Sequence, residues 1–430
     1  MSTTTGEASI PIHETPLAGV TTVIEKKTPV LLSTLALLLL AIVAIWPKSG
    51  DTTYRLAVPS DFAQLPTVTV PSTLTAWIVV VVCGLCAAWS VVLYRRHRAT
   101  PLWLVVVYSV AWVFGFLTWA ATGGTIPLVG LLSGSLALAV PLVFGALGGV
   151  LGERSGVVNI AIEGQLLAGA FAAAMVASVL DSAWAGLVAA SAAGVLVALI
   201  LGLFAITYFV DQVIVGVVLN VLVLGLTSFM FTQVLAPNAA SLNAPPHFKA
   251  IPIPVLGDIP LVGPIFFRQT VIVYLLYVAV ALVTWSLYRS KWGLRVRAVG
   301  EHPKAADTVG IKVNRTRYRT ILIAGAVAGV GGAFYTLVSV PQFNREMTGG
   351  AGYIALAAVI FGKWDPIRAT LAALLFGFAS NLQGVLSVIG SPVPSQFMLM
   401  LPYVVTIFAV AGLVGRSRPP AADGIPYRKG

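Results

Sequence analysis

Polar side chains interrupt the apolar run from residue 155 to residue 171, and they are the first residues in this chain that could do chemistry. Asn159, Glu163 and Gln165 carry hydrogen-bonding groups that are costly when they face lipid. In a helix that begins near residue 159, Asn159 and Glu163 are four residues apart and share a face. We therefore expect Glu163 to face the interior of a helix bundle or a water-filled path.

Glu163 has two interpretations. As a structural group, a carboxylate in the first turn of a helix is stabilised by the helix dipole, and it could cap the N–H groups of a broken helix or pair with Arg154. As a group on a translocation path, it would form hydrogen bonds with the hydroxyl groups of a solute. The structural interpretation is favoured, because the position lies in the cytoplasmic half of a helix that begins at the inner surface.

Other polar and aromatic side chains extend the set of path candidates. Asn220 lies about two turns into the next polar-interrupted run, where Asp211 is a plausible helix cap. For each amide, hydrogen bonding between helices is an alternative to solute contact. Phe343 and Tyr353 could stack on a base. The substrate-path candidates are therefore Asn159, Glu163, Gln165, Asn220, Phe343 and Tyr353.

No enzymatic chemistry is visible in the sequence. It contains no GxxxxGKS or GxxxxGKT phosphate loop, no HExxH and no GxSxG. The four histidines fall in loops or in the N-terminal tail, and no two have metal-ligand spacing. We predict no catalytic residue, no metal and no cofactor. Few ionisable groups lie deep in the apolar runs, so the energy for active transport would come from a partner.

The composition shows which elements must hold these residues. Hydrophobic residues make up 58% of the chain, charged residues only 10%, and the mean hydropathy is +0.94. Soluble domains carry about 25% charged residues. The chain is therefore predicted to be an integral membrane protein surrounded by lipid. We interpret the net charge of +11 as the excess of Lys and Arg in cytoplasmic loops rather than as a nucleic-acid site.

Twelve apolar runs are long enough, or nearly long enough, to cross a bilayer core of about 30 Å. Continuous rather than alternating apolar residues exclude a β-barrel. We predict an all-α polytopic membrane helix bundle with about 10–12 transmembrane helices, of which the short run 350–362 is broken or re-entrant. The runs are 30–46, 74–94, 101–120, 127–151, 160–180, 183–209, 212–233, 270–288, 320–340, 350–362, 367–388 and 396–414.

The distribution of Lys and Arg predicts the orientation. With the N-terminus inside, most of the 26 basic residues fall in inner segments. Those in outer segments are Lys48, Arg55, Lys249, Arg268 and Arg345. Both termini are therefore predicted to be cytoplasmic.

The predicted division of the chain has four parts. Residues 1–29 are a disordered cytoplasmic tail, 30–125 an N-terminal extension with about three spans, 126–415 the core, and 416–430 a second cytoplasmic tail. A Pro-rich outer loop at about 235–269 is predicted to form an extended external cap, either as a docking surface or as a passive connector.

The long inner loop from Tyr288 to Arg319 is a candidate docking element. Within it, 301–311 can form a short helix, because Pro303 suits a first helical turn and Gly310 suits a helix end. Ala305 and Ala306 would present a small flat face to a groove on a second protein. An ordinary basic inner loop is the alternative.

Glycines spaced four apart mark close helix contacts. The pairs are Gly145/Gly149, Gly148/Gly152, Gly152/Gly156 and Gly325/Gly329. Such spacing lets helix backbones approach closely, so we predict packing rather than solute contact.

Three motifs carry a family resemblance. The stretch GLRVRAVGEHPKAADTVGIKVNRTRYRTILIAGAVAGVGGAFYTL resembles the coupling-loop region of bacterial ABC-transporter permeases of the branched-chain amino acid/simple sugar/nucleoside class. GALGGVLGERSGVVNIAIEGQLLAGAF and GYIALAAVIFGKWDPIRATLAALLFGF resemble two further regions of these permeases. The resemblance covers roughly residues 130–415 and is closest to the nucleoside (guanosine-type) import permease.

This resemblance implies a permease subunit, not an enzyme, in the bacterial cytoplasmic membrane. The implied partners are a cytoplasmic ABC ATPase with two fused nucleotide-binding domains, a second related permease and an extracytoplasmic solute-binding lipoprotein. The residues that it places in the ATPase-coupling loop are Gly300, Glu301, His302, Pro303, Ala305, Ala306, Asp307 and Gly310.

The sequence therefore predicts an importer of nucleosides driven by a separate ATPase. A ribose-like simple-sugar importer and a secondary carrier that works without an ATPase are the alternatives.

Overall fold

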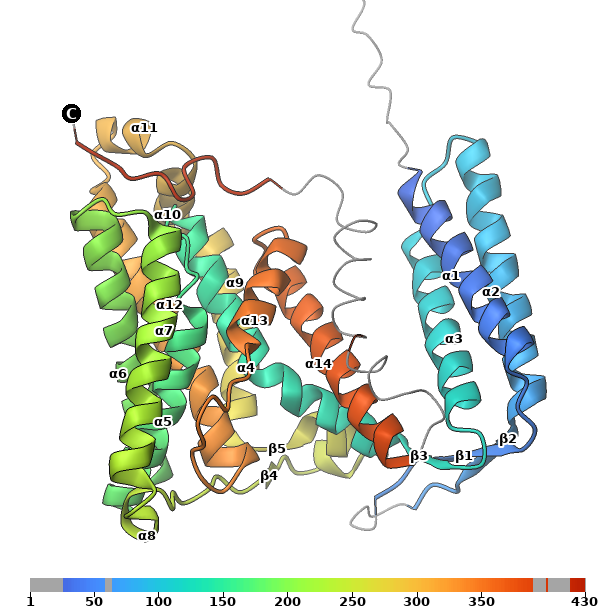
Figure 1. The fold of residues 1–430 in the computed structure, drawn as a ribbon. Helices are drawn as coiled ribbons and strands as arrows, with labels where there is room; N and C mark the ends of the chain where they lie inside the picture. The colour runs from blue at the N-terminus through green and yellow to red at the C-terminus, as the bar shows by residue number, and fades with distance from the viewer. Residues whose placement is uncertain (1–25, 59–63, 390–399, 401–417, 430) are drawn as a thin grey trace, which may run out of the picture.

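The computed structural model describes residues 26–58, 64–389, 400 and 418–429 (Figure 1). Within these ranges, ten helices are long and apolar enough to cross a membrane. They confirm the predicted all-α bundle, and their limits lie close to those of the apolar runs. Apart from residue 400, the predicted run 396–414 lies outside the described residues. The ten helices are α1 Lys27–Ile45, α2 Ser72–Arg95, α3 Leu102–Ala120, α4 Leu128–Arg154, α5 Ile162–Leu180, α6 Ala183–Gly202, α7 Gln212–Met230, α9 Val271–Arg289, α12 Val313–Phe334 and α14 Pro366–Ile389.

Several of these helices end in a π-helical turn. The turns η1 Leu203–Thr207, η2 Phe231–Leu235 and η5 Tyr335–Ser339 extend α6, α7 and α12. Asp211 caps α7 as predicted, because its carboxylate accepts hydrogen bonds from the backbone N–H groups of Val213 and Ile214.

The connections contain shorter elements. In the outer loop these are α8 Ala239–Leu242, β4 Ile251–Pro252, η3 Leu256–Asp258, η4 Gly263–Phe267 and β5 Arg268–Gln269. In the inner loop they are α10 Lys291–Glu301 and α11 Pro303–Thr308. A small sheet of β1 Asp51–Arg55, β2 Val68–Pro71 and β3 Thr125–Pro127 was not predicted. Its order is β2-β1-β3, with β1 antiparallel to β2 and parallel to β3.

The N-terminal helices form a group of their own. Helices α1, α2 and α3 pack on one another, and Figure 1 shows them beside the core helices. Near the sheet, a shared apolar cluster joins this group to the core through Leu131 of α4 and Leu382 and Leu386 of α14. The predicted N-terminal extension is therefore a three-helix unit that contacts the core at one end.

Glycines hold the core helices at short range. A Cβ atom added at Gly194 of α6 would lie 2.0 Å from the carbonyl oxygen of Gly325 in α12, and one at Gly148 of α4 would lie 2.8 Å from that of Ala324. The predicted packing role is confirmed for these helical glycines. The prediction for the pair Gly152/Gly156 is wrong for Gly156. This residue lies beyond the end of α4 with a φ of +83°, so it is not part of a helical pair.

One helix spans only part of the bilayer. Helix α13, Ala351–Phe361, has 11 residues, so it is about 16 Å long, roughly half of the bilayer core. It lies at mid-height in Figure 1, between the ends of α12 and α14. The positive φ of Gly350, +84°, turns the chain into its first residue. The prediction of a short, broken segment at 350–362 is confirmed.

The tight α6–α12 contact gives a stability prediction. Gly194→Ala forces two backbones apart, so it lowers the free energy of unfolding by about 1–3 kcal/mol, the usual cost of overpacking. Gly84 in α2 is the matched control, since a Cβ there meets no atom within 4 Å. Gly84→Ala leaves the unfolding free energy equal or raises it by up to about 1 kcal/mol. Equal stability of the two variants in detergent unfolding would contradict this packing account.

Candidate functional site

One cavity in the core has several polar side chains in its walls. Its volume is about 210 Å³, and it lies between α5, α7, α13 and the segment before α13. Three of the predicted path residues line it, which makes it the candidate solute site. The lining residues are Glu163, Asn220, Val221, Leu224, Glu346, Gly349, Gly350 and Tyr353.

Glu163 caps the half-length helix. Its carboxylate accepts hydrogen bonds from the Thr348 hydroxyl at 2.6 Å, from the Gly350 N–H at 2.9 Å and from the Gly352 N–H at 2.6 Å. The side chain is only 7% exposed. The N-terminus of α13 is therefore capped by a buried carboxyl group, which is one of the two structural arrangements considered for Glu163 in the sequence. Arg154, the other partner considered, instead donates to the carbonyl oxygen of Trp364 at 2.8 Å.

Asn220 joins three elements at the cavity. Its Oδ1 accepts from the Gly164 N–H at 2.8 Å, and its Nδ2 lies 2.9 Å from the carbonyl oxygen of Ile160 and 3.1 Å from the hydroxyl of Tyr353. The Tyr353 side chain is 48% exposed. The amide thus fixes the tyrosine hydroxyl while leaving a large part of that side chain accessible for contact with a solute.

The other path candidates lie away from this cavity. Asn159 and Gln165 form a reciprocal pair of hydrogen bonds, each 3.1 Å long, and both side chains are fully buried. Phe343 is also fully buried, with its ring 5.3 Å from that of Phe171. The backbone N–H and carbonyl groups of Phe343 are both bonded by the Asn243 side chain. These three residues stabilise helix and loop packing in this structure.

Sequence reasoning missed the segment just before α13. Glu346 and Gly349 line the cavity, and Thr348 donates to Glu163. The sequence does contain a marker, the Gly349-Gly350 pair immediately before a short apolar run. Both glycines have positive φ, at +54° and +84°, as expected where a chain turns sharply into a helix.

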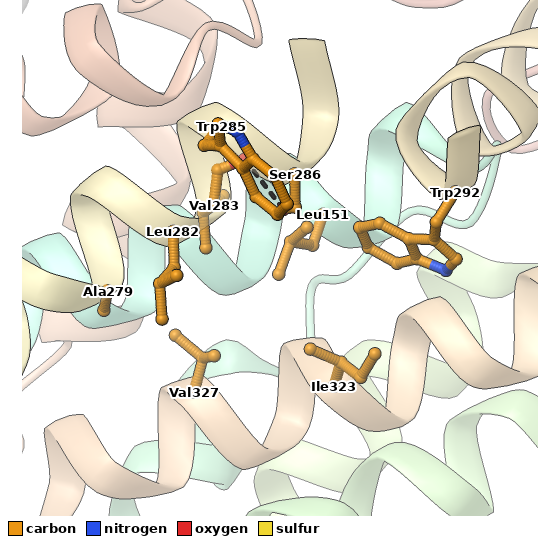
Figure 2. A pocket seen from close by; sticks show the side chains of 9 residues that line it. All are labelled: Leu151, Ala279, Leu282, Val283, Trp285, Ser286, Trp292, Ile323 and Val327. Carbon is orange, nitrogen blue, oxygen red and sulfur yellow. Dashed lines mark hydrogen bonds between the residues drawn. The ribbon is translucent and has the colours of Figure 1, made fainter. Parts of the chain in front are cut away.

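A second cavity, of about 450 Å³, is almost entirely apolar. Figure 2 shows its walls, which come from α4, α9, α10 and α12. Ser286 is its one hydroxyl side chain, and that hydroxyl donates to the carbonyl oxygen of Val283. Such walls offer a hydroxyl-rich solute almost no hydrogen bonds. The lining residues are Leu151, Ala279, Leu282, Val283, Trp285, Ser286, Trp292, Ile323 and Val327.

The inner loop forms two short helices. The hydroxyl of Ser290 caps α10 through the Gly293 N–H, Pro303 begins α11, and Gly310 follows it with a φ of +85°. The short helix predicted within 301–311 is confirmed, although His302 separates it from α10.

The predicted coupling residues divide between two faces of this loop. Exposed side chains are those of Glu301, His302 and Ala305, and Gly310 is exposed as well; Pro303 and Asp307 are half-buried. Ala306 and Gly300 are buried against the protein, so the predicted flat face of Ala305 and Ala306 is wrong for Ala306. The cause is the packing of Ala306 with Val299 and Val313.

Within the described ranges, no cluster of three or more His, Cys, Asp or Glu side chains could hold a metal ion.

The Glu163 cap gives a second prediction. Glu163→Ala leaves the Gly350 and Gly352 N–H groups and the Thr348 hydroxyl without their acceptor, so it lowers the unfolding free energy by about 2–4 kcal/mol. Glu346→Ala is the matched control, since Glu346 lines the same cavity but is exposed. Its effect stays within about 0.5 kcal/mol. If Glu163→Ala and Glu346→Ala lower the free energy of unfolding in detergent equally, Glu163 does not cap α13.

Comparisons with known proteins identify relatives of the core. The sequence profile described as "Branched-chain amino acid transport system / permease component" matches residues 131–410. The guanosine ABC transporter permease protein NupQ of Bacillus subtilis is 44% identical over 309 residues, which cover 69% of this chain and 95% of NupQ.

Two further relatives are the nucleoside permease NupC of Lactococcus lactis and the putative glucose permease TsgC13 of Haloferax volcanii. NupC is 35% identical, with 70% of this chain and 96% of NupC covered. TsgC13 is 34% identical, with 67% and 92% covered. No protein of solved structure matches the chain significantly.

Proposed function

Because this chain belongs to the permease-component family of branched-chain amino acid-type transport systems, we propose that it is the membrane-spanning subunit of an ABC importer for nucleosides. The proposal is supported by two relatives whose names specify guanosine and nucleoside transport, at 44% and 35% identity. The observation that carries it is the cavity between α5, α7 and α13, where the exposed Tyr353 side chain and the Asn220 amide lie beside the α13 cap.

The charges of the cavity support an uncharged solute. Glu163 already occupies the positive end of α13, so that helix end offers no free attraction to an anion. Glu346 adds a second carboxylate to the same walls. Nucleoside monophosphates, which are anionic, would therefore be disfavoured relative to nucleosides.

A simple-sugar importer is the second candidate. It is supported by the putative glucose permease TsgC13, which is 34% identical to this chain. The amide and carboxylate groups of the cavity suit sugar hydroxyls as well as they suit a ribose. The aromatic ring is the feature that favours a nucleoside, because a base can stack on it.

The source of energy is proposed to be a cytoplasmic ATPase, in which two nucleotide-binding domains are fused. The family implies such a partner, and the sequence has no phosphate loop of its own. We propose that α11 and its flanking residues seat in that ATPase, with both termini in the cytoplasm. The exposed Ala305 and Val309 of this segment support the seat, since apolar side chains outside the membrane indicate a partner.

Two further partners complete the proposal. A second, related permease would pack beside the cavity, against α7. The α7 side chains of Val217, Val218, Val221 and Leu222 are at least 45% exposed and form an apolar face beside it. An extracytoplasmic lipoprotein would deliver the solute to the outer loop. We also propose that residues 30–125 are an extension to a core that begins near residue 126.

Tyr353 distinguishes the two solutes. Tyr353→Ala removes a stacking surface for the base, so it lowers uptake of labelled guanosine by about 5- to 100-fold, which corresponds to 1–3 kcal/mol of stacking. Uptake by the Tyr353→Phe control, which keeps the ring and loses the hydroxyl, falls much less. Preserved guanosine uptake in the Tyr353→Ala variant, or strong uptake of ribose in place of guanosine, would overturn the nucleoside assignment.

The proposed seat gives a fourth prediction. Val309, beside α11, is 76% exposed, so Val309→Asp leaves the fold intact but places a charge in the contact with the ATPase. Co-purification of the ATPase falls about tenfold or more, and uptake falls with it. Val309→Ile is the conservative control. If Val309→Asp binds the ATPase normally, α11 is not the seat. If uptake persists without any ATPase but collapses with an uncoupler, the chain is a secondary carrier.

A further inference from the structure

The last described residues, 418–429, lie against the same end of the core as α10 and α11 (Figure 1). We call this segment the C-terminal strap. Sequence analysis predicted only a cytoplasmic tail at 416–430, whereas the strap has buried side chains at Pro420, Ala422 and Tyr427. It is therefore a packed part of the core.

A buried arginine holds the strap. Arg317 of α12 is 1% exposed, and it donates from Nη1 to the carbonyl oxygen of Ile425 at 2.9 Å and from Nη2 to that of Ala422 at 3.4 Å. Its Nε donates to the carbonyl oxygen of Ser155 at 3.2 Å. One side chain thus joins the strap to the turn between α4 and α5. A charge buried this deeply is costly unless it is well bonded, so this link is strongly specified.

The strap also binds the two helices of the inner loop. The Ala422 N–H donates to the carbonyl oxygen of Gly300 at 2.8 Å, and the Ala421 N–H donates to the Glu301 carboxylate at 3.2 Å. Tyr427 packs in an apolar cluster with Val299, Ala306 and Val313. A Cβ at Gly300 would lie 2.2 Å from the carbonyl oxygen of Arg154, so α10 also rests on the end of α4. The strap, α10, α11 and the α4–α5 turn form one packed unit.

Asp423 adds a buried carboxyl to this unit. Burial raises the pKa of Asp423 to about 7, and the neighbouring Arg317 guanidinium opposes that rise. The charge of Asp423 therefore interacts with the Arg317 guanidinium that holds the strap. Binding experiments on the strap are best compared at one fixed pH.

The outer face of the strap is apolar and basic. Ile425 is 54% exposed, although it lies at the cytoplasmic end of the chain beyond the membrane-spanning helices. Arg418, Arg428 and Lys429 are exposed beside it, and Lys304 is exposed on α11. The strap packs directly on α10 and α11, so its exposed side chains lie at the same end of the core as Ala305 and Val309.

We propose that the C-terminal strap is a second docking element for the cytoplasmic ATPase, and that it seats, together with α11, in an apolar groove with an acidic rim. This inference rests on the proposed function. An exposed isoleucine among cations outside the bilayer is the pattern of a protein interface. Arg317 positions the strap, so a displacement of the seated ATPase reaches the α4–α5 turn, and thus the start of the helix that carries Glu163.

The test changes the exposed face without disturbing the anchor. Ile425→Asp and the conservative control Ile425→Val are compared at pH 8 for thermal unfolding in detergent and for co-purification of the ATPase. Both variants unfold like the parent protein. Ile425→Asp retains at least about tenfold less ATPase, whereas Ile425→Val retains the normal amount.

A labelling experiment measures the contact directly. Cys83 and Cys86 are the chain's two cysteines, so a Cys83→Ser, Cys86→Ser background leaves a single thiol after Ile425→Cys. Added ATPase slows maleimide labelling of that thiol about tenfold. Arg96→Cys, at the exposed end of α2 in the N-terminal group, labels at the same rate with and without ATPase.

The outcomes separate this inference from the proposed function. If Val309→Asp loses the ATPase while Ile425→Asp retains it and the thiol at 425 stays unprotected, the strap is no docking element, but the coupling role of α11 stands. If neither Asp variant loses the ATPase, the coupling role fails as well. If Ile425→Asp retains the normal amount of ATPase but binds vesicles rich in anionic lipid more weakly than the parent protein, the strap lies on the membrane surface. That result would overturn the inference.

Discussion

The buried carboxylate of Glu163 is the constraint on which the rest of the core depends. The first N–H groups of α13 have no hydrogen-bond partner within the helix. Away from water, such groups need a partner from the protein itself. Glu163 accepts from two of those N–H groups and from the Thr348 hydroxyl, so it fixes α13 to α5. The same bonds place the α13 end, Asn220 and Tyr353 around one small polar cavity. The structural cap and the proposed solute site therefore share the same residues, so Glu163 would serve both interpretations.

Close backbone packing makes that arrangement rigid and connects it to the end of the core that carries α10 and α11. Glycines let the backbones of α6 and α4 contact carbonyl groups of α12. Because these contacts are tight, movement of one helix displaces its neighbours. At the inner end, Arg317 and Gly300 join α12 and α10 to the α4–α5 turn. A partner that pushes on α11 would therefore act on the helix that carries Glu163, through contacts between packed side chains and backbone rather than through a flexible loop.

Much of this structure could be predicted from the sequence, for identifiable reasons. The long apolar runs predicted the helix limits, and the glycine spacing predicted close contacts between helices. Pro303 and Gly310 predicted the limits of α11. The cap on α13 was considered only as one possibility, because its N–H groups come from a segment almost 190 residues away from Glu163. Asn159, Gln165 and Phe343 were predicted on polarity or aromaticity alone, which do not reveal a partner. The strap was not predicted, because the sequence does not distinguish its anchor, Arg317, from the other basic residues of the loop. Only the structure shows that Arg317 is buried.

The central claim is that the cavity beside Glu163 binds the solute, and a protection experiment tests it most directly. Val221 lines the cavity, so a thiol made by Val221→Cys in the Cys83→Ser, Cys86→Ser background reports the occupancy of the cavity. With the complete transporter in nanodiscs, the account predicts that guanosine slows alkylation of this thiol at concentrations that saturate uptake, while guanosine monophosphate does not. An alkylation rate that guanosine leaves unchanged, in protein that still transports it, would contradict the account.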